Sequence, residues 1–154
     1  MPVIATAIRS LAFILVAASC QPESNSWEVK ETKSRHRSHQ AVRLAKKPDN
    51  PFRGMEIEFV KTSSGRRAYL NVYSLAFPST GADGKQTEVL IRSGEIEHRF
   101  LASRLEGGQR VLLPEDATNL LIEQLTNQQT VVIISGRFDV KVSPGEFPSL
   151  KNKL

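Results

Sequence analysis

Short runs in which apolar and polar residues alternate fill most of the chain from residue 55 onward. The runs at residues 55–61 and 67–74 have the two-residue period of a half-buried strand, and Ser63-Ser64-Gly65 between them supplies a turn. These two runs therefore predict a hairpin. Five further runs have the same alternation or the compact apolar character of a buried strand. They span residues 87–92, 95–102, 110–113, 130–135 and 137–142.

Residues 114–127 form the one strong helix candidate. Pro114 suits the first helical position, and Glu115 and Asp116 place negative charge where the helix dipole favours it. Apolar residues recur at helical spacing and form a single stripe. They are Ala117, Leu120, Leu121 and Leu125. The stripe predicts packing against a sheet face, with a partner-binding helix as the alternative.

About seven short strands with one amphipathic helix late in the order predict a mainly β fold. The expected architecture is an antiparallel sandwich or an open barrel, covered in part by the helix. A parallel α/β fold is disfavoured, because it needs a helix between most successive strands. We expect this β-rich domain to span residues 53–150, followed by a C-terminal tail at 151–154.

The first twenty residues have a different pattern. Residues 11–18 read L-A-F-I-L-V-A-A behind Arg9, which is too short to span a bilayer and fits the apolar region of a signal peptide. The small residues Ala17-Ala18-Ser19 follow, and then Cys20, the only cysteine of the 154 residues. Without further information, this pattern fits an ordinary signal peptide that happens to be followed by a cysteine, and it also fits a buried N-terminal helix.

Ala17-Ala18-Ser19-Cys20 resembles the lipobox of bacterial prolipoproteins, with Ala17 where leucine is usual. The resemblance implies a signal peptide over residues 1–19, cleavage between Ser19 and Cys20, and acylation (diacylglycerol, palmitate) of Cys20. Two or more acyl chains hold a protein stably on a membrane. The resemblance also implies a bacterial cell envelope location. Gln21 rather than aspartate after the cysteine favours the outer membrane, facing the periplasm or the surface.

Residues 20–52 are predicted to form a lipidated, basic and flexible tether. Residues 32–48 hold six Lys or Arg, two His and no acid, and such a composition is typical of disordered segments. The basic residues are candidates for contact with an anionic surface, such as lipid head groups, acidic cell-wall groups or an acidic protein. They are Lys33, Arg35, Arg37, Arg43, Lys46 and Lys47. The alternative is a solvated linker, and Trp27 either enters the membrane interface or docks on the domain.

No catalytic residue, metal or cofactor is predicted. The three histidines are His36, His39 and His98, and with Cys20 assigned to lipid they are too few for a zinc site. His98 shares a strand face with Ile96 and Phe100 and is interpreted as a core or edge residue. No G-x-S-x-G or H-E-x-x-H motif occurs, and Gly107-Gly108 predicts a turn rather than a phosphate loop.

The sequence thus predicts a membrane-anchored envelope lipoprotein with a non-enzymatic binding or structural domain. Alternatives are a surface-directed adhesin or inhibitor that uses the loop at residues 79–85, and, less favoured, a hydrolase. Tyr69 and Tyr73, on the strand face opposite Leu70 and Val72, are candidate contacts for an envelope or host protein. A net charge of +5 is a mild bias toward anionic partners, and no nucleic acid is expected. Residues 106–118 (E-G-G-Q-R-V-L-L-P-E-D-A-T) resemble small uncharacterised envelope lipoproteins. This resemblance implies no particular activity.

Overall fold

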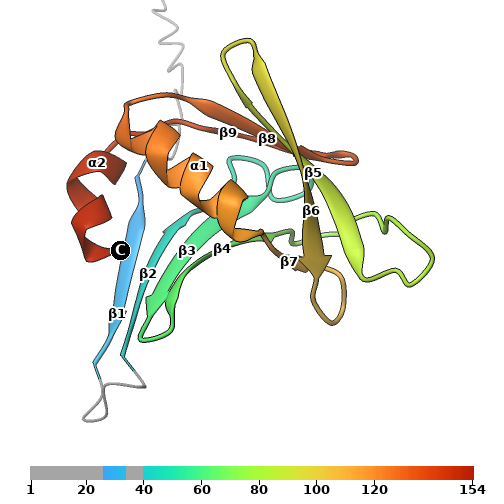
Figure 1. The fold of residues 1–154 in the computed structure, drawn as a ribbon, viewed down its shortest axis with the longest axis horizontal. Coiled ribbons are helices and arrows are strands. Elements are labelled where there is room, and N and C mark those ends of the chain that lie inside the picture. The colour runs from blue at the N-terminus through green and yellow to red at the C-terminus, as the bar shows by residue number, and fades with distance from the viewer. Residues whose placement is uncertain (1–25, 34–39) are drawn as a thin grey trace, which may run out of the picture.

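The computed structural model describes residues 26–33 and 40–154, and this part of the chain forms one open antiparallel sheet with two short α-helices (Figure 1). The nine strands lie in the order β1-β2-β3-β4-β7-β6-β5-β8-β9. Their bounds are β1 Glu28–Thr32, β2 Ala41–Lys46, β3 Glu56–Thr62, β4 Gly65–Asn71, β5 Gln86–Ser93, β6 Ile96–Arg104, β7 Arg110–Leu112, β8 Val131–Ser135 and β9 Phe138–Val142. The helices are α1 Glu115–Thr126 and α2 Phe147–Leu150, and a 3-10 turn, Lys151–Lys153, follows α2.

The sheet curves around α1. Figure 1 shows β1–β4 on one side of this helix and β8–β9 on the other, with β5–β7 completing the turn between them. Nine strands laid flat would be about 40 Å wide, whereas a helix is about 10 Å across. Curvature therefore lets α1, together with the short segment around α2, cover the concave face of the sheet.

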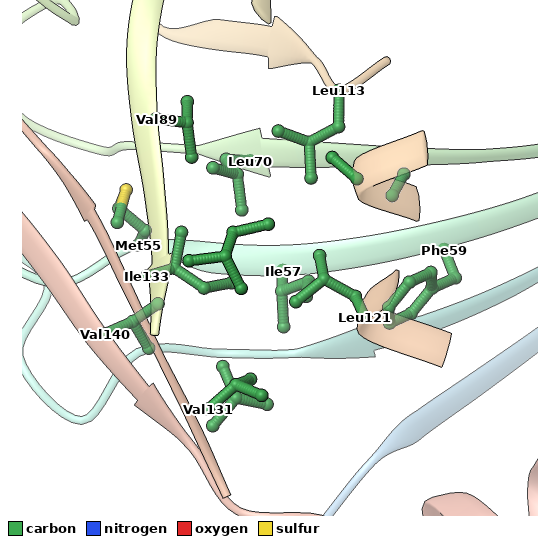
Figure 2. Close-up of a cluster of buried hydrophobic side chains, with 14 of the residues drawn as sticks. Met55, Ile57, Phe59, Leu70, Val89, Leu113, Leu121, Val131, Ile133 and Val140 are labelled. Atoms are coloured by element: carbon green, nitrogen blue, oxygen red, sulfur yellow. The ribbon is translucent and has the colours of Figure 1, made fainter. Parts of the chain in front are cut away.

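The core lies between the concave face of the sheet and α1 (Figure 2). Ile57 on β3, Ile133 on β8 and Leu121 on α1 have no exposed surface. Along β5, β8 and β9, and in the second half of β4, every second side chain is buried in this core, which is why the sequence alternates there. Burial of each such side chain contributes about 1.5–3 kcal/mol to stability.

The predicted mainly β, antiparallel fold with one helix late in the chain is confirmed, but a sandwich of two sheets is wrong. All described strands belong to one sheet, which is open with β1 and β9 at its edges. The seven predicted strands correspond to β3–β9, and β3 and β4 form the predicted hairpin. The predicted helix is α1, with Pro114 as the residue that precedes it and Asn127 as the residue that ends it.

The prediction of a flexible tether is wrong for β1 and β2. β1 pairs with β2 from Glu28↔Ala45 to Thr32↔Ala41, and β2 pairs in turn with β3. Trp27 docks on the domain: it is 5% exposed, and its indole N–H donates to the Pro144 carbonyl at 3.0 Å. The prediction failed because it weighed the basic composition of this segment, whereas Leu44, Ala45 and Trp27 suffice to tie the segment to the core.

The C-terminal residues also belong to the domain, in contrast to the predicted tail at 151–154. Phe147 is fully buried, and the centre of its ring lies 4.9 Å from the ring centre of Trp27 and 5.3 Å from that of Phe59. Leu154 is 7% exposed, and Lys153 forms an ion pair with Glu31 at 2.7 Å. The segment after β9 therefore fastens β1 to the rest of the structure.

Candidate functional site

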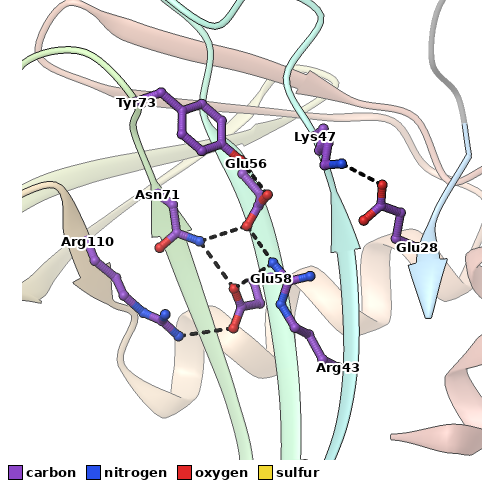
Figure 3. Close-up of polar contacts among 8 residues, drawn as sticks. All are labelled: Glu28, Arg43, Lys47, Glu56, Glu58, Asn71, Tyr73 and Arg110. Atoms are coloured by element: carbon purple, nitrogen blue, oxygen red, sulfur yellow. Dashed lines mark hydrogen bonds and ion pairs between the residues drawn. The ribbon is translucent and has the colours of Figure 1, made fainter. Parts of the chain in front are cut away.

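Six polar side chains gather on the outer face of the sheet, the face turned away from α1 (Figure 3). We call this group the carboxylate cluster. It consists of Arg43 of β2, Glu56 and Glu58 of β3, Asn71 of β4, Tyr73 just after β4, and Arg110 of β7. The strand period places it there, because Ile57 and Phe59 point into the core and their neighbours must point outward.

Two buried carboxylates are matched by two guanidinium groups in this cluster. The side chains of Glu56 and Glu58 are each 6% exposed. Arg43 Nη2 lies 2.7 Å from Glu56 Oε1 and 3.0 Å from Glu58 Oε2, so this one group bridges both acids. Arg110 Nη2 lies 3.0 Å from Glu58 Oε1. The formal charges therefore cancel, which is what buried carboxylates require.

Neutral donors complete the coordination of the acids. The Asn71 amide donates to Glu56 Oε1 at 3.0 Å and to Glu58 Oε2 at 3.3 Å, and the Tyr73 hydroxyl donates to Glu56 Oε2. Burial raises the pKa of Tyr73 well above its ordinary value, and the bond to Glu56 raises it further. The hydroxyl proton therefore stays in place as a donor to the carboxylate. All four carboxylate oxygens of the two acids have a donor.

The two tyrosines predicted as partner contacts lie on the expected face. Leu70 and Val72 are buried in the core, so the side chains of Tyr69 and Tyr73 take the outer face. The Arg110 guanidinium lies 4.0 Å from the centre of the Tyr69 ring, a cation–π contact. Tyr73 is 52% exposed, with its hydroxyl turned toward Glu56. Their role in binding a partner stays a prediction.

Three of the predicted anionic-surface contacts are engaged within the protein. Arg43 belongs to the carboxylate cluster, and Lys46 is 5% exposed with Nζ 3.4 Å from the Ser143 carbonyl. Lys47 Nζ lies 2.7 Å from Glu28 Oε1, and this hydrogen bond raises the pKa of Lys47 and lowers that of Glu28. Lys33 is exposed. The remaining predicted residues, Ser19, Cys20, Arg35 and Arg37, lie outside the described residues.

Comparison of the chain with protein-family models, with curated proteins and with solved structures finds no match in any of the three. The functional argument therefore depends on the residues of this chain.

His98 lies at an exposed position on β6, and its ring stacks at 6.3 Å on that of Phe100. It is thus a surface residue rather than a core residue. Within residues 26–33 and 40–154, no group of three or more His, Cys, Asp or Glu side chains is arranged to hold a metal ion. The same part of the chain contains no helix long and apolar enough to cross a membrane. His36 and His39 lie outside it.

A second surface feature lies beside the carboxylate cluster, in the loops at one end of β3 and β4. Phe52 is 72% exposed and Leu75 is 57% exposed, and both loops meet where Ser74 Oγ donates to the Phe52 carbonyl at 2.8 Å. With the exposed ring of Tyr73 these side chains form what we call the loop patch. Sequence analysis singled out only Tyr73 of this patch.

Sequence analysis also missed Glu56, Glu58, Asn71 and Arg110. The only local signal was the E-I-E run at residues 56–58, in which two acids occupy the same strand face. The partners of these acids come from three other strands, and one of them is 52 residues away along the chain. Strand order and register, which the sequence pattern left open, decide that these groups meet.

Proposed function

We propose that the protein is a lipid-anchored envelope protein whose β-rich domain acts by binding or by structural support rather than by catalysis. The observation that carries the proposal is the short distance along the chain between Cys20 and the first docked residue. Six residues, 21–26, separate Cys20 from Trp27. Trp27 is held in the core by the rings of Phe59 and Phe147.

This spacing limits how far the domain can move from its anchor. A fully extended chain advances about 3.3–3.6 Å per residue, so the seven steps from Cys20 to Trp27 span at most about 25 Å. An acylated Cys20 would therefore keep the domain at the membrane surface. The largest distance between domain and membrane would be shorter than with the tether predicted from composition, which extended to residue 52. A domain fixed at this distance suits a partner that is itself part of the envelope.

The carboxylate cluster supports a non-enzymatic role. General acid–base catalysis needs a carboxyl group that can reach a substrate proton. The oxygens of Glu56 and Glu58 are already occupied by donors from Arg43, Asn71, Tyr73 and Arg110. What the cluster presents to solvent is instead the guanidinium of Arg110 on Tyr69 and the ring of Tyr73. Aromatic and arginine side chains of this kind are enriched at protein interfaces.

Intact-mass spectrometry of the full chain from a bacterial membrane fraction tests the anchor. We expect a mature protein that begins at Cys20 and carries acyl mass, and loss of this form in Cys20→Ser. Ser24→Ala, a change of similar size four residues along, serves as the matched control and should be processed normally. An unmodified wild-type chain, whether cut elsewhere or not cut, would refute the proposal.

A further inference from the structure

We propose that the loop patch (Phe52, Tyr73 and Leu75) contacts the bilayer surface to which Cys20 is attached. This inference rests on the proposed lipid anchor and adds to it an orientation of the domain. The occupant of the patch is the lipid head-group and upper acyl region of that bilayer.

The loop patch lies at the end of the sheet where the N-terminal segment leaves the domain. In the register of β1, β2 and β3, Glu28 lies opposite Ala45, and Lys46 lies opposite Ile57. β1 therefore begins at the end of the sheet where β2 ends, at Lys46. The loop that carries Phe52 begins at Lys47, directly after β2, and the Phe52 carbonyl accepts a hydrogen bond from Ser74, between Tyr73 and Leu75.

The length of the chain between the anchor and the domain restricts which surface can meet the membrane. From Cys20 to Ser26 the chain reaches at most about 22 Å. The opposite end of β3, at the hairpin that joins it to β4, is one strand further away, about 23 Å for the seven residues of β3. The end with the loop patch is therefore the end that the anchor holds nearest to the bilayer.

The composition of this end favours an apolar contact over an electrostatic one. The described residues contain six large exposed hydrophobic side chains, and three of them make up the loop patch. The charges near the Phe52 loop balance, because Arg53 and Lys141 line the same hollow as Asp49 and Asp139, and Lys47 pairs with Glu28. The exposed Phe52 and Leu75 side chains and the Tyr73 ring offer apolar surface that the upper acyl region of a bilayer can bury. Binding should therefore not require anionic lipid.

The carboxylate cluster holds one member of the patch, Tyr73, in place. Glu56 accepts the hydroxyl proton of Tyr73 and is itself held by Arg43 and Asn71. The Tyr73 ring is thus positioned before any lipid is met, and little side-chain freedom is lost on contact.

A single added cysteine can report the contact, because acylation of Cys20 leaves no other thiol in the chain. The full-length acylated protein carrying Leu75→Cys is labelled with an environment-sensitive fluorophore and reconstituted into phosphatidylcholine vesicles. Ser63→Cys, exposed in the hairpin at the far end of β3, is the matched control. Both variants are first checked for unchanged thermal unfolding and for the acyl mass on Cys20.

We expect a blue-shifted emission at position 75 that nitroxide-labelled lipid quenches severalfold more strongly than the emission at position 63. Equal, water-like emission at both positions with the acyl mass present would overturn the orientation and leave the lipid anchor standing. Equal quenching at both positions would also overturn it, since the domain would then lie on the bilayer without this orientation. Absence of the acyl mass would instead overturn the proposed function, and the orientation with it.

Discussion

Arg43 is the side chain on which the carboxylate cluster depends most, because it is the cationic group that pairs with both buried acids, whereas Arg110 pairs with Glu58. Arg43→Met keeps much of the apolar stem and removes the charge. Breaking a buried ion pair from one side costs about 3–5 kcal/mol. The Arg43 side chain is 27% exposed, so solvent weakens its pairing and we expect a loss of about 2–4 kcal/mol in the free energy of unfolding.

Urea denaturation of the full-length protein measures this loss. Trp27 is the only tryptophan and is buried against Phe59, so its fluorescence reports unfolding of the domain. The matched background is Glu56→Gln with Glu58→Gln, in which Arg43→Met removes no ion pair and should cost less than about 1 kcal/mol. Equal costs in the two backgrounds would refute the reasoning, because the charge of Arg43 would then be irrelevant to its contribution.

Three further predictions follow from the packing and from the shifted pKa. The raised pKa of Tyr73 means that the folded protein keeps this proton above the ordinary value of about 10, so its contribution to stability is complete below that pH and is lost as the pH rises further. Urea midpoints measured across this range should fall more steeply for the wild type than for Tyr73→Phe; parallel curves would contradict the bond to the carboxylate. Gly108→Ala should lower the unfolding free energy by about 2–3 kcal/mol, against about 1 kcal/mol for Gly94→Ala, as chemical denaturation can show. Both glycines have positive φ, but only at Gly108 would a Cβ lie 2.4 Å from Arg104 Nη2, which cannot move freely because its Nη1 donates to a backbone carbonyl at 2.6 Å. Phe147→Ala should cost about 3–5 kcal/mol in the same assay, because its fully buried ring packs on two others; a loss under 1 kcal/mol would show that the segment after β9 is not part of the core.

The part of the fold that alternation encodes could be predicted from the sequence. Residues 55–61 and 67–74 alternate because Ile57 and Leu70 face a core and their neighbours face solvent, and the structure confirms the hairpin. The helix could be predicted equally well, since it has acidic residues in its first turn and a single apolar stripe. These signals are local and do not depend on which strands become neighbours.

The arrangement of the strands required information that no local pattern contains. β7 lies between β4 and β6, so Arg110 meets Glu58 across β4. Nor does alternation distinguish two stacked sheets from one sheet that curves around a helix, because both bury every second residue. A sandwich and an open barrel were both predicted for this reason, whereas the structure is one open sheet that curves around α1.

The prediction of a flexible tether over residues 20–52 was based on basic composition, and it was wrong for the part that connects Cys20 to the domain. Charged residues suggest disorder when their partners are unknown, yet Lys47 pairs with Glu28 and Arg43 pairs with two acids of β3. Those pairs draw β1 and β2 into the sheet, and Trp27 then closes on Phe59 and Phe147. Because these contacts make β1 and β2 part of the folded domain, only six residues separate Cys20 from Trp27. A short connection restricts how the domain is oriented relative to its anchor, whereas a long flexible tether does not. For this reason the end of the sheet that carries Phe52 and Leu75 is the part of the domain to test for contact with a bilayer.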